Sequence, residues 1–258
     1  MLREQFEDVR ERIHQACQRS GRDPASVTLV GVTKGVDVGD VREAIALGLS
    51  DLGENRVQEA RAKQLALGSR LKAEGKSLEP SASSLQPVRW HLIGHLQRNK
   101  AKSAVELFDA IHSVDSNELI ADLDRHAARL AQGSRLKAEG KDVRRPLSVF
   151  LQVNVSGEAS KFGCRIEDAV LLARRIAQTS HIPLAGLMTI APFCDNPEDA
   201  RPQFRRLRVL RDDVASALSL QPSALSLSMG MSQDFEVAIE EGADIVRIGT
   251  AIFGKRGG

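Results

Sequence analysis

Short, β-branched apolar runs alternate along this chain with longer segments whose apolar residues recur at helical spacing. The short runs predict strands at 27–34, 51–54, 88–94, 108–114, 147–155, 183–191, 224–230 and 243–250. The periodic segments predict an amphipathic first helix at about 2–20, then helices at 38–48, 56–67, 98–106, 117–131, 167–178, 197–218 and 234–241. Strands separated by helices form βαβ units, so this pattern predicts an α/β protein, a (β/α)8 TIM barrel with an extra N-terminal helix. A doubly wound open sheet is the alternative, but no G-x-G-x-x-G motif follows the first strand.

One repeated segment interrupts this pattern. The sequence GSRLKAEGK occurs at 68–76 and again at 133–141, each time between a predicted helix and the next strand. Two separated copies are too sparse for a solenoid, which needs contiguous repeats. We therefore expect surface insertions at about 68–86 and 133–145, on the barrel face opposite the usual ligand site. The whole chain, 1–258, is predicted to be a single barrel domain.

Charge and cysteine content narrow the function classes. The 36 Lys and Arg residues nearly balance the 34 Asp and Glu residues, which argues against nucleic acid as a partner. No run approaches the roughly 20 apolar residues of a membrane span, and the N-terminal segment lacks the apolar region of a secretory signal. The three cysteines (Cys17, Cys164 and Cys194) form no CxxC pair, and the histidines show no metal-ligand spacing. We expect a cytoplasmic protein without disulfides or a metal site.

A lysine at the end of the first strand is the first candidate for chemistry. Side chains alternate across a strand, so Val30, Val32 and Lys34 share one face. If that face points inward, Lys34 lies at the barrel mouth, where partial desolvation favours the neutral amine that forms a Schiff base. A solvent-exposed lysine is the commoner alternative for this residue type.

The last two strands carry features of an anion site. Val246 and Ile248 form the apolar face of the last strand, which turns Arg247 toward the barrel interior, where it must meet an anion or another acceptor. Gly249 and Thr250 follow it. The preceding strand places Ser226 and Ser228 on one face and ends at Gly230, and Ser232 or Gln233 is positioned to cap the next helix. Because the final loops of such barrels often bind phosphate, these residues together indicate a phosphorylated carbonyl ligand, such as pyridoxal 5′-phosphate (PLP).

Several ordered motifs resemble one family. They are VTLVGVTKGV, DLGENRVQEA, RWHLIGHLQRNK, LQVNVSGEASKFG, GLMTIAP and LSMGMSQDFEVAIEEGADIVRIGTAIFG. Together they resemble the pyridoxal phosphate homeostasis proteins, PLP-binding proteins with the alanine-racemase N-terminal barrel fold. The resemblance covers about residues 5–255, excepting the two insertions.

The resemblance implies roles for individual residues. Lys34 matches the lysine that forms the internal aldimine with PLP. Ser228, Gly249 and Thr250 match positions around the cofactor phosphate, and Arg247 resembles the arginine near the pyridine ring and phosphate. An arginine facing the ring nitrogen keeps it unprotonated and weakens the electron sink.

Asn55 completes the set of expected cofactor-binding residues, and three further residues are weaker candidates. Asn55 resembles an asparagine that lines the pocket. Met188 and His91 are interpreted equally well as ring contacts or as core. Lys161 is the runner-up for the PLP-binding amine.

The sequence is consistent with two functions of different classes, a binding protein and an enzyme. The first is a PLP carrier of vitamin B6 homeostasis that holds PLP on Lys34 without a dedicated reaction, with PLP-dependent apo-enzymes as acceptors. The second is a PLP-dependent amino-acid racemase of broad specificity. Related racemases use a catalytic tyrosine and a further C-terminal domain, whereas this sequence contains no tyrosine. The sequence therefore favours the carrier, and we expect it to be a monomer.

Overall fold

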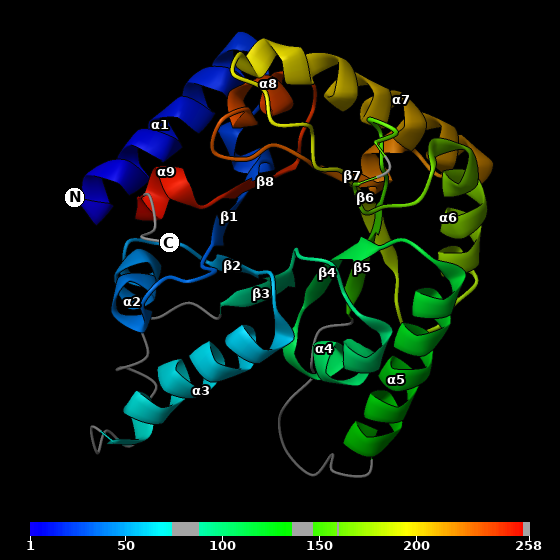
Figure 1. The fold of residues 1–258 in the computed structure, drawn as a ribbon, viewed down its shortest axis with the longest axis horizontal. Coiled ribbons are helices and arrows are strands. Elements are labelled where there is room, and N and C mark those ends of the chain that lie inside the picture. The colour runs from blue at the N-terminus through cyan, green and yellow to red at the C-terminus, as the bar shows by residue number, and fades with distance from the viewer. Residues whose placement is uncertain (74–87, 136–146, 159, 255–258) are drawn as a thin grey trace.

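The computed structural model describes residues 1–73, 88–135, 147–158 and 160–254. Its strands form a closed barrel in which each is hydrogen-bonded to the next in parallel, and the last pairs with the first (Figure 1). The strands are β1 (Thr28–Val32), β2 (Asp51–Glu54), β3 (Arg89–Leu92), β4 (Ala110–Val114), β5 (Ser148–Gln152), β6 (Leu184–Met188), β7 (Ser226–Ser228) and β8 (Ile245–Ile248). The predicted (β/α)8 TIM barrel is confirmed.

A ring of helices surrounds the strands (Figure 1). These are α1 (Leu2–Arg19), α2 (Val38–Ala46), α3 (Val57–Ala73), α4 (Ala101–Leu107), α5 (Asn117–Arg135), α6 (Ala169–Ala177), α7 (Arg201–Ala217), α8 (Phe235–Glu240) and α9 (Thr250–Phe253). The N-terminal helix α1 packs against α8 and α9, where Arg12 forms an ion pair with Glu236 at 2.7 Å. In the described part of the chain, no helix combines the length and apolar character needed to cross a membrane.

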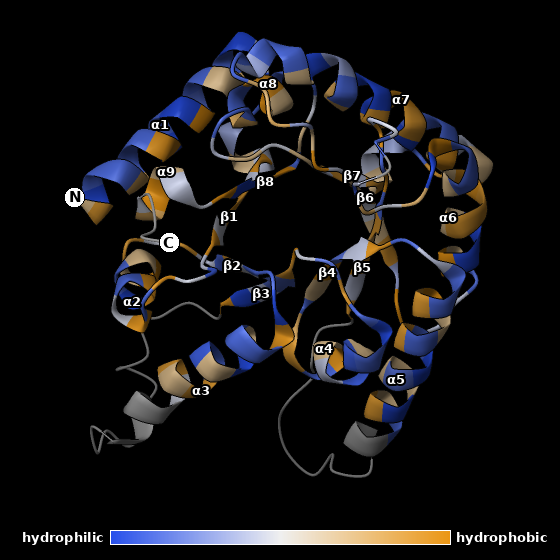
Figure 2. Cartoon of the chain, in the orientation of Figure 1, coloured by the Kyte–Doolittle hydropathy of each residue, from blue (hydrophilic) through white to orange (hydrophobic). Residues whose placement is uncertain are grey.

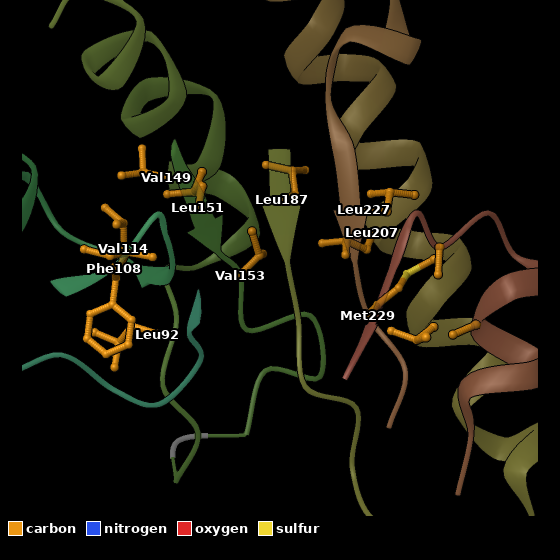
Figure 3. Packing of buried hydrophobic residues seen from close by; sticks show 14 of the residues in the cluster. Leu92, Phe108, Val114, Val149, Leu151, Val153, Leu187, Leu207, Leu227 and Met229 are labelled. Atoms are coloured by element: carbon orange, nitrogen blue, oxygen red, sulfur yellow. The ribbon is translucent and has the colours of Figure 1, made fainter. Parts of the chain in front are cut away.

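Two apolar cores stabilise the barrel and the ring of helices around it. The larger lies between the strands and the helices, and Figure 2 shows hydrophobic and hydrophilic residues alternating around the helices that cover it. Figure 3 shows part of this core, with labelled residues Leu92, Phe108, Val114, Val149, Leu151, Val153, Leu187, Leu207, Leu227 and Met229. The smaller core fills the barrel with Val30, Ala110, Phe150, Met188 and Ile245. Met188 is fully buried there, and therefore its place is in the core.

The structure corrects several predicted boundaries. The helices predicted to end at 67 and 131 continue to Ala73 and Arg135, so the first residues of both GSRLKAEGK copies are helical. The Leu, Lys, Arg and Ala residues around each repeat are strong helix formers, and therefore α3 does not end at Gly68 and α5 does not end at Gly133. The rest of each insertion, 74–86 and 136–145, lies outside the described residues. The short helix α9 was not predicted.

The register of the closing strand pair sets up the site. Val30 on β1 lies beside Arg247 on β8, and Thr28 lies beside Ile245. Val246 and Ile248 belong to the outer core under the helices, whereas Ile245 belongs to the inner one. Arg247 therefore points into the barrel, as the alternation along the strand predicts.

Candidate functional site

A cavity of about 660 Å³ opens at the carboxyl ends of the strands. Loops after β3, β5, β6, β7 and β8 contribute to its wall. Ligand sites of (β/α)8 barrels lie at this end because the βα loops converge there. Its lining includes the predicted site residues Asn55, Arg247, Gly249 and Thr250, together with Lys161.

Arg247 is the buried cation of this cavity. Its side chain is 3% exposed, and its Nη1 donates to Ser228 Oγ at 2.7 Å while Nη2 donates to the Thr189 carbonyl at 2.8 Å. Burial lowers the pKa of the Arg247 guanidinium to about 10, so the group stays charged at neutral pH. No described carboxylate forms an ion pair with it. The charge of Asp234, which also lines the cavity, acts on Arg247 without forming an ion pair. Because a buried charge without a directly paired counterion is costly, the arrangement favours an anionic or acceptor ligand in the cavity.

The loops after β7 and β8 are tied together by a serine. Ser232 Oγ accepts hydrogen bonds from the backbone N–H groups of Gly249 and Ala251, both at 3.3 Å, and Ser232 lines the cavity. Gly230 turns the chain into this loop with φ of 93°, and a Cβ there would lie 2.6 Å from the Ala238 Cβ. The loops therefore place backbone N–H groups and hydroxyls around one end of the cavity, as phosphate sites require.

The turn that carries Lys34 is held from outside the barrel. Lys63, which is 5% exposed, donates to the Thr33 carbonyl and to Glu54 Oε1. Thr33 Oγ1 also donates to Glu54 Oε1, at 2.6 Å. Burial raises the pKa of the Glu54 carboxyl even though Lys63 and Thr33 stabilise its charged form. This cluster fixes the backbone next to Lys34 and leaves the Lys34 side chain out of the network.

Lys34 itself is exposed, and the residues that line the cavity do not include it. The strand ends at Val32, which does line the cavity, and residues 34 and 35 form a turn beyond it. Two residues span at most about 7 Å, so the flexible four-carbon stem of Lys34 starts close to the cavity rim. Its role in binding the cofactor stays a prediction.

Ser228 lies deeper than its predicted role at a phosphate requires. The residue is fully buried under Arg247 and is not part of the cavity wall. Ser232, predicted only as one of two candidate helix caps, occupies the wall instead. The signal that separates the two serines is their position relative to the strand end, because Ser228 is the last residue of β7 and Ser232 lies in the loop.

The lysine and cysteines near the mouth differ in environment. Lys161 lines the cavity, and its Nζ lies 3.4 Å from a carboxylate oxygen of Glu158. Cys194 is half-buried in the wall. Cys164 is buried, and burial raises the pKa of its thiol to about 12, so it is not a reactive thiolate. In the part of the chain that the structure describes, no group of three or more His, Cys, Asp or Glu residues could hold a metal ion.

A row of polar side chains that sequence reasoning largely missed crosses the barrel below Arg247. Asp51 Oδ1 lies 2.8 Å from His91 Nε2, and His91 Nδ1 lies 2.9 Å from His112 Nε2. His112 Nδ1 in turn lies 2.8 Å from Ser228 Oγ. All four residues are buried, so His91 belongs to this row and does not line the cavity. Inward alternation on β3 and β4 is the signal that could have found both histidines.

One carboxyl group and one imidazole in this row, those of Asp51 and His112, have pKa values shifted from their ordinary ones. Burial of Asp51 opposes ionisation, but hydrogen bonds from His91 and Ser50 outweigh it and lower the pKa. Burial above all, together with the nearby charge of Arg247, holds the pKa of His112 well below 6.5. At neutral pH Asp51 is therefore ionised and His112 is neutral.

The depressed pKa of His112 predicts a loss of stability in mild acid. Below about pH 6.5 this histidine binds a proton in the unfolded chain but stays neutral in the folded protein. The unfolded state therefore binds more protons, and the free energy of unfolding decreases as the pH is lowered. The slope from this residue is at most about 1.4 kcal/mol per pH unit. Urea unfolding of the wild type and His112→Asn at pH 7 and pH 5.5 measures it, and we expect the variant to lose less stability than the wild type. Equal losses would show that His112 does not cause the effect.

A family model and named relatives match this chain over nearly its whole length. The family model described as "Alanine racemase, N-terminal domain" matches residues 6–257. The pyridoxal phosphate homeostasis protein of Pseudomonas aeruginosa is 41% identical over 255 residues, covering 99% of this chain and 96% of the relative. The one from Aquifex aeolicus is 39% identical, with coverage of 98% and 97%.

A solved structure agrees with these relatives. The structure of PipY from Synechococcus elongatus with PLP bound is 33% identical, with a TM-score of 0.75, and the match covers 98% of this chain and 100% of PipY. Identity above 30% over nearly the full length of both chains, on the same barrel, extends the resemblance of the short motifs to the whole sequence. This chain therefore belongs to the family of pyridoxal phosphate homeostasis proteins, which is built on the alanine racemase N-terminal domain.

Proposed function

We propose that this protein binds PLP in the cavity at the carboxyl ends of its strands and serves intracellular PLP homeostasis, with Lys34 as the amine that holds the cofactor. The observation that carries the proposal is Arg247, a buried guanidinium at the cavity that forms no ion pair with a carboxylate among the described residues. An anionic cofactor supplies the missing charge. The names of the relatives and the PLP bound to PipY support the same ligand.

The residues of the cavity offer polar groups that suit the phosphate and the ring of this cofactor. The loops after β7 and β8, which contain Ser232, Gly249 and Thr250, offer hydroxyl and backbone donors to a phosphate. Arg247 has five N–H groups, of which two have a partner among the described residues, so donors remain for the cofactor. Asn55, which follows β2, adds an amide to the wall. When bound, PLP supplies an aldehyde that condenses with an amine and releases water.

The proposed role is that of a carrier without a dedicated reaction. Lys34 lies on an exposed turn, which leaves the bond to the cofactor open to competing amines. A cofactor held in this way can be surrendered to PLP-dependent apo-enzymes, which we propose as its acceptors. We further propose that the single barrel domain over 1–258 acts as a monomer.

Absorbance spectroscopy tests the binding proposal directly. The purified protein, incubated with PLP and dialysed, is expected to show a visible absorbance band that borohydride removes by reducing the Schiff base. Digestion should then yield one modified peptide, and it should contain Lys34. A colourless protein after dialysis would contradict PLP binding, and a modified peptide without Lys34 would contradict the assignment of the amine.

The racemase alternative is tested by hydrogen exchange. A racemase exchanges the α-hydrogen of its amino acid with solvent deuterium at an enzyme-like rate. For the carrier we expect no such exchange above that of free PLP across a panel of L- and D-amino acids. Rapid exchange of any of them would show an enzyme.

A further inference from the structure

A row of hydrogen bonds runs from the floor of the cavity through the barrel interior and joins five buried residues. Starting at Arg247, the chain passes Ser228, His112 and His91 and ends at Asp51. The four heavy-atom distances lie between 2.7 and 2.9 Å. Within the described residues, Arg89 is the other cation next to this row, with Nε 3.7 Å from Asp51 Oδ1.

The chemistry of the two ends sets the direction of every bond between them. A guanidinium only donates and an ionised carboxylate only accepts. Arg247 donates to Ser228 Oγ, and the Ser228 hydroxyl, which needs an acceptor of its own, donates to His112 Nδ1. His112 Nε2–H then donates to His91 Nδ1, and His91 Nε2–H donates to Asp51. The Ser228 hydroxyl and all four imidazole nitrogens then have a partner, and both imidazoles carry their hydrogen on Nε2.

The opposite arrangement leaves a buried hydrogen without an acceptor. If His112 carried its hydrogen on Nδ1, it would donate to Ser228 Oγ, which already accepts from Arg247. The Ser228 hydroxyl would then have lost its acceptor in a fully buried position, which costs about 1–3 kcal/mol. The neutral state of His112, which burial enforces, agrees with the first arrangement.

From this geometry we propose that His112 is a positioning residue that acts through Ser228 to hold Arg247 toward the PLP site. The inference rests on the proposed function. By accepting the Ser228 hydrogen, His112 turns the hydroxyl lone pairs toward Arg247 Nη1, and the Thr189 carbonyl holds Nη2. The His112 ring is itself fixed by stacking on Phe150, with ring centroids 4.2 Å apart. Two guanidinium N–H groups are thus anchored from below, and the remaining donors are free to meet the cofactor.

Nitrogen NMR of the imidazoles tests the row without any cofactor. In the full chain without added PLP, at pH 7, we expect His112 to be neutral, and both His112 and His91 to carry hydrogen on Nε2 and to accept at Nδ1. His112 with its hydrogen on Nδ1, or as the charged imidazolium, would overturn the proposed direction of the row. This outcome does not depend on whether PLP binds.

A mutant cycle tests the action through Arg247. His112→Phe keeps the aromatic packing but removes the acceptor, and we expect it to weaken PLP binding roughly tenfold. In an Arg247→Lys background the same change should cost less than about twofold, because the group that His112 positions is gone. Equal losses in both backgrounds would show a merely structural effect and overturn the proposal. Where His112→Phe does not fold, Ser228→Ala replaces it in both backgrounds with the same expectations.

Two controls separate positioning from general damage. Ser113→Ala changes a fully buried residue on the same strand whose hydroxyl has no hydrogen-bond partner among the described residues, and it should leave PLP binding unchanged. His112→Asn keeps an acceptor near the Ser228 hydroxyl and should recover binding to within about threefold of the wild type. Failure of this recovery would contradict the role of the acceptor. If the wild type itself binds no PLP, the proposed function fails. The NMR result still tests the direction of the hydrogen bonds in the row.

Discussion

Lys34→Ala is expected to abolish the visible absorbance of protein-bound PLP and the borohydride-stable label. The reason is chemical, because alanine has no amine to condense with the aldehyde. Lys34 is exposed and makes no hydrogen bond or ion pair with another described residue. The variant should therefore unfold within about 0.5 kcal/mol of the wild type. Absorbance titration with PLP and urea unfolding measure the two effects separately.

The matched control for this variant is Lys161→Ala. Lys161 lines the cavity, whereas Lys34 lies on the turn beyond Val32, so position alone does not favour Lys34. We expect Lys161→Ala to retain the absorbance band, because its ammonium already has the Glu158 carboxylate 3.4 Å away. Loss of the band in Lys161→Ala and its retention in Lys34→Ala would move the cofactor amine to Lys161.

Strand alternation predicted the inner face of the barrel well. Val246 and Ile248 needed an apolar surface, so Arg247 had to face inward, and the structure places it there. The same alternation fails at Lys34, because the strand ends at Val32 and the following turn has its own backbone conformation. Local pattern therefore predicts side-chain direction inside a strand but not beyond its end.

Contacts between distant strands were harder to predict. The row from Asp51 to Ser228 depends on the relative heights of four strands, and no local pattern shows that height. His91 lies opposite Ala110, which places His112 further along the next strand, within hydrogen-bond reach. Both GSRLKAEGK copies begin inside the preceding helix, α3 or α5, because helix propensity there exceeds the effect of one glycine. The rest of each insertion lies outside the described residues.

Arg247→Ala is expected to weaken PLP binding by about 100-fold. The guanidinium is the buried cation at the cavity, and its removal leaves the cofactor's anionic group facing Ser228 and Thr189 without a compensating charge. Equilibrium dialysis of PLP against the purified variant measures the change. The effect should depend weakly on salt, because a buried interaction is poorly screened.

Arg247→Lys is the control that separates charge from geometry. Lysine keeps the positive charge but presents a point charge in place of the planar fork that reaches Ser228 and Thr189 together. We expect it to bind PLP about tenfold more weakly than the wild type and about tenfold more tightly than Arg247→Ala. If Arg247→Ala instead retained PLP as tightly as the wild type, the anion would have to sit elsewhere in the cavity. The only role left for the arginine would then be to satisfy Ser228 and the Thr189 carbonyl inside the barrel.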